Sequence, residues 1–295
     1  MNIDKERIQE ILEIFSPGAD LMNFKRLEGG VSSDVFQIEI ELEKTLKKLV
    51  LRSEGGPPAE NTIKTEFELL KILHETEIPC AEPLFLDTSR KILDKEFMLM
   101  SHLEGSIDIP DRKNLSSIKE IARNLRSIHE TNTSFLPNLP LRIDPLEELF
   151  DYLPHGKNGD KLKKFLSTKN NTEYKGTRVF LHGDYWPGNI LWKQKKITGI
   201  VDWEYAAIGD PFSDLAVTSL ELRYEYGVKG MEELLEIYSS FLPIDRLRYS
   251  LWLIFVASST LYFIHEWKLT KDRESSMKKE AMATIEEESY FLLNS

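Results

Sequence analysis

Cysteine is almost absent from the sequence, since Cys80 is the only one among 295 residues. A single cysteine excludes an internal disulfide and favours a reducing compartment. Neither Cys80 nor His182 has a second Cys or His at metal-ligand spacing, so we do not expect either of them to ligate a metal ion.

Long apolar runs are also missing. The longest apolar-rich stretch, 251–264, is interrupted by Ser258, Ser259 and Thr260, and its 14 residues are too few to span a bilayer. The N-terminal residues lack the apolar segment of a signal peptide. We therefore expect a cytoplasmic protein without a membrane partner, in which 251–264 forms a core helix.

Positive charge is in short supply. Lys and Arg total 38 against 49 Asp and Glu, so the net charge is 38 − 49 = −11. Such a surplus disfavours nucleic acid and anionic membranes, which bind basic patches. It would tolerate or attract a cationic substrate, although general solubility is the more ordinary explanation of the charge.

A loop between two apolar runs carries the clearest chemical pattern. Asp184 and Asn189 lie five positions apart, between the apolar runs 178–181 and 197–201. Eukaryotic-type kinases have the same Asp-to-Asn spacing in their catalytic loop, where the Asn also helps to hold a metal ion. The spacing predicts a phosphoryl-transfer site in which one carboxylate receives the acceptor hydroxyl.

A second carboxylate, Asp202, stands where the second apolar run ends. A hairpin from Asn189 would return the chain to the same place, because paired strands with a tight turn bring their ends together. Mg²⁺ prefers oxygen ligands in near-octahedral geometry, so an amide oxygen, a carboxylate and nucleotide phosphates suit it. Two alternatives stay open: His182-Gly183-Asp184 can be an ordinary turn, and Asp202 can be only a helix N-cap, which leaves Asn189 unexplained.

Three segments together resemble the aminoglycoside phosphotransferase and choline kinase-like family. They are His182-Gly-Asp-Tyr-Trp-Pro-Gly-Asn189-Ile-Leu, Ile200-Val-Asp202-Trp-Glu and Gly209-Asp-Pro-Phe-Ser-Asp214-Leu-Ala. The resemblance covers nearly the whole chain. It implies that Asp184 is the catalytic carboxylate, that Asn189 and Asp202 bind Mg²⁺, and that Asp214 braces the loop.

A glycine-containing turn near the N-terminus has the composition of a phosphate-binding loop. In Gly29-Gly30-Val31-Ser32-Ser33, backbone N–H groups can approach phosphate oxygens because glycine has no Cβ. Taken alone, this segment is only a hairpin turn. The family that the chain resembles has its nucleotide-covering loop here, which implies nucleotide contacts for Gly30, Ser32 and Ser33.

The next expected strand, 48–52, ends in Arg52, where kinases have a Lys that pairs with a helix Glu. Arginine is always charged and makes bidentate contacts to phosphate and carboxylate, so it can still meet the electrostatic need. The resemblance implies that Glu66, in the helix expected at 60–75, is its partner. The alternative is an exposed surface carboxylate. By the same resemblance, the Ser101 carbonyl and the Leu103 N–H would bind the nucleobase.

The periodicity changes along the chain from strands to helices. Strands are expected at 24–28, 35–42, 48–52, 83–88 and 96–100, and helices at 4–15, 60–75, 116–129, 145–153, 160–166, 213–224, 230–241, 244–268 and 271–293. This order predicts an α+β, bilobal, protein-kinase-like fold with a small antiparallel-sheet lobe and a larger, mainly helical lobe. We expect an N-terminal nucleotide-binding lobe at 1–100, a hinge linker at 101–106 and a C-terminal catalytic and substrate-binding lobe at 107–295.

The acceptor should be small. Only eleven residues separate Asp202 from Asp214, whereas protein kinases have a long activation segment there. The expected function is ATP-dependent transfer of the γ-phosphoryl group to a hydroxyl of an aminoglycoside-like, amino-alcohol or sugar substrate, with Mg²⁺ as cofactor and GTP not excluded. The alternative is a nucleotide-binding module without transfer activity.

Substrate selection is expected in the helical lobe. Its acidic and aromatic side chains could hold a cationic group, although most of them are expected to be ordinary surface charges and core rings. These side chains are Asp108, Asp111, Glu221, Glu225, Tyr224, Tyr226, Trp252 and Trp267.

Overall fold

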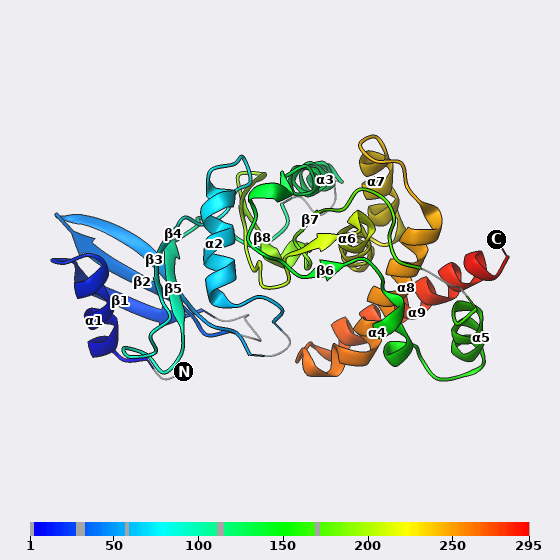
Figure 1. Cartoon of the computed structure of the whole chain (residues 1–295), viewed down its shortest axis with the longest axis horizontal. Coiled ribbons are helices and arrows are strands. Elements are labelled where there is room, and N and C mark those ends of the chain that lie inside the picture. The colour runs from blue at the N-terminus through cyan, green and yellow to red at the C-terminus, as the bar shows by residue number, and fades with distance from the viewer. Residues whose placement is uncertain (1–2, 28–32, 57–58, 111–114, 169–171, 295) are drawn as a thin grey trace. The chain divides into compact units, whose positions relative to one another are not determined.

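The structure is a computed structural model that describes residues 3–27, 33–56, 59–110, 115–168 and 172–294 (Figure 1). The chain forms two compact units. The sheet unit comprises residues 1–106, 134–140 and 190–206, and the helical unit comprises residues 107–133, 141–189 and 207–295. The segment 190–206, which the sequence analysis placed in the C-terminal lobe, is therefore part of the sheet unit. The assignment of nucleotide and substrate binding to separate lobes stays a prediction.

The sheet unit is built on a five-stranded antiparallel sheet of order β1-β2-β3-β5-β4. Its strands are β1 (Asp20–Arg26), β2 (Val35–Leu42), β3 (Thr45–Ser53), β4 (Pro83–Asp87) and β5 (Phe97–Ser101). Helix α1 (Lys5–Phe15) packs on it through Ile8, Ile11 and Leu12, which join a core that contains Ile38 and Leu51. Strand β1 begins earlier than expected because Asp20 pairs with Glu41 of β2, a contact that local periodicity does not report.

Helix α2 (Ile63–His74) begins three residues after its expected start. Thr62 explains the boundary: its side chain accepts a hydrogen bond from Thr65 N at 3.1 Å and thereby caps the first turn. The helix buries Leu69, Leu70 and Leu73 together with one charged side chain, Glu66. A buried carboxylate on a helix needs a charged partner, which β3 supplies.

The predicted hairpin is present in the sheet unit as β8 (Ile190–Lys193) and β9 (Lys196–Ile200). Its two turn residues, Gln194 and Lys195, have φ values of +50° and +66°. Positive φ at both positions is typical of the tight turn that suits the twist of paired strands. Asp202 therefore lies two residues after the end of β9.

The helical unit contains most of the remaining chain. Its helices are α3 (Ser116–His129), α4 (Leu146–Tyr152), α5 (Lys157–Leu166), α6 (Pro211–Tyr226), α7 (Val228–Ser239), α8 (Arg246–Phe263) and α9 (Lys271–Asn294). It also holds a small sheet of order β6-β10-β7, formed by Leu141–Arg142, Ala207–Gly209 and Val179–Leu181. Of these three strands, only β7 coincides with a feature of the sequence analysis, the apolar run 178–181. Together, the two units confirm the predicted α+β class.

One segment of the described residues, Arg246–Glu266, is long and apolar enough to cross a membrane by length and composition alone. In the structure 61% of its apolar window is buried inside the protein. Trp252, Leu253 and Ile254 are almost completely covered. The segment therefore packs as a core helix of the helical unit, and it ends as an α-helix at Phe263 before a 3₁₀ turn, Ile264–Glu266.

Candidate active site

The loop after β7 (residues 182–189) is held by Asp214, which lies in the first turn of α6. The Asp214 carboxylate, which is fully buried, accepts hydrogen bonds at 2.8 Å from the backbone N–H groups of both His182 and Gly183. His129 Nε2 lies 3.3 Å from the same carboxylate. Burial alone would raise the pKa of Asp214, but hydrogen bonding and charge from His129, with the nearby His182, lower it below its ordinary value. Asp214 therefore braces the loop as an ionised carboxylate.

Gly183 provides the change of direction that follows β7. Its φ of +86° lies in the left-handed region, which a residue with a Cβ adopts only with strain. Its carbonyl oxygen accepts a hydrogen bond from Arg142 Nη1 at 2.8 Å, while its N–H is held by Asp214. The peptide before Asp184 is fixed on both sides, which places the Asp184 side chain.

Asp184 and Asn189 come together as the spacing predicts. Asn189 Nδ2 donates to the Asp184 carbonyl oxygen at 2.9 Å and to Asp184 Oδ2 at 3.0 Å. A second donor, Trp186 Nε1, lies 3.2 Å from the same Oδ2. Because the Asn189 amide nitrogen is occupied with Asp184, its amide oxygen is the end that can meet a cation. The catalytic role of Asp184 stays a prediction, now with a defined geometry.

The buried Arg52 forms the centre of a second cluster, which lies within the sheet unit. The expected ion pair between Arg52 and Glu66 is present, so Glu66 is not a surface carboxylate. Arg52 Nη2 also lies 3.0 Å from Asp202 Oδ1 and 2.7 Å from Glu204 Oε2. Only 8% of the Arg52 side chain is exposed. One guanidinium thus holds three carboxylates, of which the sequence analysis anticipated Glu66 alone as a partner.

Asp202 has a strained backbone. Its φ of +67° is unusual for a residue with a side chain and costs of order 1–3 kcal/mol. Its side chain is 36% exposed, in contrast to 5% for Glu204. Strain of this kind persists where the surroundings fix the residue, and it is concentrated at functional sites. Asp202 is therefore the partly accessible carboxylate of the Arg52 cluster.

The remaining predicted nucleotide contacts are placed as follows. Gly30 and Ser32 lie outside the described residues, whereas Ser33 is half-buried at the bend before β2. Ser101 ends β5, opposite Leu49, and the Leu103 side chain packs so tightly on Gly199 that a Cβ there would lie 2.7 Å from Leu103 Cδ1. The contacts of these residues with a nucleotide stay predictions.

The donor atoms suit Mg²⁺ brought in by a nucleotide. Asn189 offers an amide oxygen from the helical unit, and Asp202 offers a half-exposed carboxylate from the sheet unit. Among the described residues, no group of three or more His, Cys, Asp or Glu side chains is arranged to hold a metal ion. Mg²⁺ that arrives with phosphates needs only one or two protein ligands, and an amide oxygen and a carboxylate oxygen are each of the kind that it binds.

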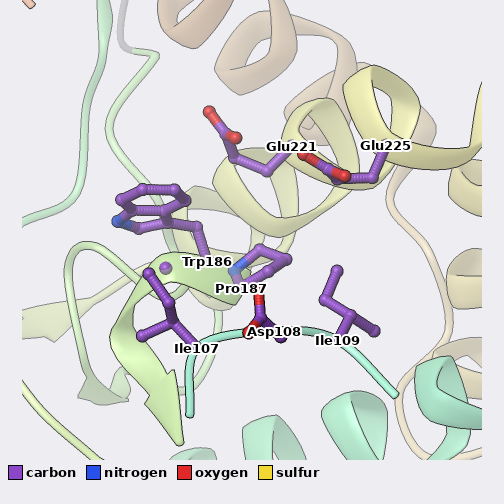
Figure 2. A pocket seen from close by; sticks show the side chains of 8 residues that line it. Ile107, Asp108, Ile109, Trp186, Pro187, Glu221 and Glu225 are labelled. Atoms are coloured by element: carbon purple, nitrogen blue, oxygen red, sulfur yellow. The ribbon is translucent and has the colours of Figure 1, made fainter. Parts of the chain in front are cut away.

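A pocket of about 130 Å³ lies beside the Asp184 loop, within the helical unit. We call it the Trp186 pocket. Figure 2 shows Trp186 and Pro187 between the segment 107–109, which lies below them, and Glu221 and Glu225, which lie above. Its lining residues are Ile107, Asp108, Ile109, Trp186, Pro187, Gly188, Glu221 and Glu225. Three of the four acidic residues singled out in the sequence line it, and the fourth, Asp111, lies outside the described residues.

Glu221 has an unusual protonation. Burial raises its pKa to about 8, and the negative charges of Asp184 and Glu225 add to this, while Arg273 opposes it. Glu225 is paired with Arg273 of α9, with 2.7 Å between Nη2 and Oε1. The Trp186 pocket therefore combines one carboxyl that holds its proton near neutral pH with one carboxylate that already has a cationic partner.

Two of the aromatic residues considered for a cation site, Trp252 and Tyr224, are buried and do not line the Trp186 pocket. Trp252 is buried and donates from Nε1 to Asp210 Oδ2 at 2.7 Å, so it belongs to the core. Tyr224 is also buried, and burial raises its pKa. Trp186, which the sequence analysis did not single out, is the aromatic side chain that lines the pocket. Its position two residues after Asp184 was the available signal.

The fold and the two clusters define a class. A five-stranded sheet with a buried strand cation paired to a helix carboxylate, and an Asp-x₄-Asn loop beside a mainly helical core, are features of protein-kinase-like phosphotransferases. Residues 23–252 match the phosphotransferase enzyme family, which is most of the chain. The chain belongs to this family.

Solved structures of aminoglycoside phosphotransferases resemble the chain, whereas the first curated relatives have a different name. Acyl-CoA dehydrogenase family member 11 of Mus musculus is 26% identical over 247 residues, which are 69% of this chain and 31% of that protein. The structure of a candidate aminoglycoside phosphotransferase from Ralstonia eutropha superposes with a TM-score of 0.72 at 15% identity and covers 99% of both chains. A ternary complex of the aminoglycoside phosphotransferase APH(4)-Ia with AMP-PNP and hygromycin B gives 0.64 at 14% identity, over 94% of this chain and 97% of that one.

These findings confirm the predicted family and the predicted kinase-like α+β fold. The chain spans about a third of the length of the curated acyl-CoA dehydrogenase relatives it matches. The structures share less than a fifth of their residues with this chain, so they establish its fold and not its substrate.

Proposed function

We propose that the protein is a magnesium- and ATP-dependent small-molecule kinase that phosphorylates a hydroxyl group. The observation that carries the proposal is the Asp184 carboxylate held by Asn189 Nδ2 at 3.0 Å, in a loop whose backbone is fixed by the buried Asp214. Phosphoryl transfer asks the protein mainly for positioning and charge stabilisation, and a fixed carboxylate supplies the first. In this proposal Asp184 orients the acceptor hydroxyl and accepts its proton late in the transfer.

The other clusters have complementary roles. When bound, Mg²⁺ would neutralise charge on the phosphates, and Asn189 and Asp202 are the residues that would hold it. Arg52, whose position is set by Glu66 and Glu204, would meet phosphate oxygens with its guanidinium. Ser101 and Leu103 would bind the nucleobase, and Gly30, Ser32 and Ser33 would cover the phosphates. ATP is the nucleotide proposed, and GTP remains compatible with backbone recognition.

The acceptor is a small alcohol that carries a positive charge, bound in the Trp186 pocket. The Trp186 ring supplies an aromatic wall for an ammonium group, and Asp108, Glu221 and Glu225 line the same pocket. Binding of a cation there would favour the ionised form of Glu221 and lower its raised pKa. The cavity volume of about 130 Å³ holds one ring or a short amino alcohol. The proposed acceptors are an aminoglycoside-like compound, an amino alcohol or a sugar, of which one ring or one short chain would occupy the pocket. We place this reaction in the cytoplasm, in keeping with the single buried Cys80.

One observation favours a second candidate, a nucleotide-binding module without transfer activity. Arg52 stands where kinases have Lys, and it is already engaged by three carboxylates. If those ion pairs persist in the presence of nucleotide, Arg52 would not reach the phosphates. Binding of ATP would then be weak or unproductive.

A panel of amino alcohols, amino sugars, neutral sugars and aminoglycosides, screened for ADP release with Mg-ATP, distinguishes the two. We expect release above the substrate-free background for at least one small cationic alcohol, and loss of that release with EDTA. A melting-temperature increase with Mg-ATP serves as the binding readout, since a ligand stabilises the folded state that binds it. Stabilisation by ATP with no release for any acceptor would contradict the kinase and support the module.

A further inference from the structure

We propose that Trp186 is a positioning residue for Asp184, through a hydrogen bond that also makes the base sensitive to the occupant of the Trp186 pocket. The inference rests on the proposed kinase function. Two properties of one side chain carry it: the indole N–H contacts the Asp184 carboxylate, and the indole ring lines the pocket.

The hydrogen bond acts on a defined oxygen. Trp186 Nε1 donates to Asp184 Oδ2 at 3.2 Å, and Asn189 Nδ2 donates to the same oxygen at 3.0 Å. Two donors from two different side chains fix both the rotation of the carboxylate and its distance from the loop. The amide donor belongs to Asn189, a proposed Mg²⁺ ligand, whereas the indole donor belongs to Trp186, which lines the pocket proposed for the acceptor. Asp184 therefore contacts one residue proposed to bind Mg²⁺ and one proposed to bind the acceptor.

The ring cannot move freely, because Gly188 supports it. A Cβ placed on Gly188 would lie 2.1 Å from Cη2, 2.4 Å from Cζ3 and 2.5 Å from Cζ2 of the Trp186 ring. The ring therefore rests directly on the Gly188 backbone, at a distance that only glycine permits. This contact fixes the orientation of the Trp186 ring, and so it keeps the indole N–H directed at Asp184 Oδ2. A Gly188→Ala substitution would displace the ring without removing the indole.

The same ring is half-buried and faces the Trp186 pocket (Figure 2). A ligand that packs on the ring presses it towards Gly188 and holds the N–H on Asp184. A ligand that leaves the ring uncovered does not. Acceptors that cover the Trp186 ring should therefore react with a higher kcat than acceptors that leave it uncovered, in addition to any difference in affinity.

The first experiment observes the hydrogen bond without any catalysis. Protein labelled with ¹⁵N-tryptophan gives one indole N–H resonance for each of its five Trp residues, and the resonance lost in Trp186→Phe is that of Trp186. We expect Asp184→Ala to move this resonance more than the other four, because it removes the acceptor. Glu225→Gln, which neutralises another carboxyl of the same pocket, should move it less. An unmoved Trp186 resonance in Asp184→Ala overturns the inference.

The second experiment measures the consequence for the reaction, with the acceptor found in the panel. Trp186→Phe keeps an aromatic wall and loses the donor, so kcat should fall roughly ten- to hundredfold while KM for ATP changes little. Gly188→Ala should also lower kcat and shift the Trp186 indole resonance, because the added Cβ displaces the ring. An unchanged kcat accompanied only by a lower melting temperature would mean that Trp186 is merely structural, and would overturn the inference. If the parent protein phosphorylates nothing, the kinase proposal fails, whereas the resonance experiment still decides the hydrogen bond.

Discussion

Arg52 and Asp202 form an ion pair within the sheet unit, with 3.0 Å between Nη2 and Oδ1, although 150 residues separate them in sequence. The pair connects the strand cation proposed for the phosphates to the carboxylate proposed for Mg²⁺. Glu66 and Glu204 complete the set, so that one buried guanidinium balances three acidic groups.

Removal of the guanidinium should therefore destabilise the sheet unit strongly. Arg52→Met removes the buried cation that pairs with Glu66, and we expect a loss of about 3–5 kcal/mol in the free energy of unfolding. Arg52→Lys keeps the charge but cannot reach three carboxylates with a planar fork, so it should lose less. Urea denaturation of the variants measures both values. Arg123→Lys, in an exposed pair with Glu120, is the control and should change stability by less than about 1 kcal/mol. Equal stability of Arg52→Met and the parent would mean that the cluster is not formed.

Substitution of Asp210, at the start of α6, should strongly destabilise the helical unit. It is fully buried, and its Oδ2 accepts from Arg248 Nη2 at 2.6 Å and from Trp252 Nε1 at 2.7 Å. Its Oδ1 also caps the helix by accepting from Phe212 N at 3.0 Å. Asp210→Ala removes the carboxylate that pairs with the buried Arg248. We expect the free energy of unfolding, measured by thermal or chemical denaturation, to fall by about 3–5 kcal/mol.

The control for this variant is Asp245→Ala. Asp245 caps α8 by accepting from Arg248 N at 3.1 Å. Loss of such a cap costs about 1 kcal/mol. If both variants lose the same amount, Asp210 acts as a helix cap alone and its contacts with Arg248 and Trp252 contribute nothing.

Glu221 should give the protein a measurable pH dependence. Its pKa of about 8 in the folded protein lies above the ordinary value of 4.5. Between these values the folded state binds a proton that the unfolded state does not, so this group makes stability fall as pH rises. Arg273, Asp184 and Glu225 are the charged groups that act on it.

Glu221→Gln tests this dependence because it removes the titration and keeps the shape of the side chain. Relative to the parent, the variant should gain about 1 kcal/mol or more in the free energy of unfolding as pH rises from about 5 to about 8. This difference corresponds to roughly 2–4 °C in melting temperature. A constant difference between parent and variant across that range would show that Glu221 titrates normally.

Local sequence signals predicted a substantial part of the fold and of the site. The sequence predicted a hairpin between Asn189 and Asp202, and the spacing of Asp184 and Asn189 indicated that both lie on one loop. Glu66 was identified through a family resemblance and not through its own surroundings. Its burial depends on Arg52, which arrives from a different strand.

Other features depend on contacts that are distant in sequence. Strands β6 and β10 contain two and three residues and exist only because they pair with each other and with β7, so periodicity could not reveal them. Glu204 reaches Arg52 across 152 residues. The Trp186 hydrogen bond depends on ring placement by Gly188, which no composition or spacing rule reports.

The most direct test of the account is the turnover of Asp184→Asn with Mg-ATP and the acceptor found in the panel. The amide keeps the size of the side chain but cannot accept the hydroxyl proton. We expect kcat to fall by at least roughly 10²–10⁴-fold, while the melting-temperature increase with Mg-ATP is retained. Lys119→Gln on the exposed face of α3 is the control and should behave as the parent. If Asp184→Asn turns over at the rate of the parent, Asp184 is not the catalytic carboxylate.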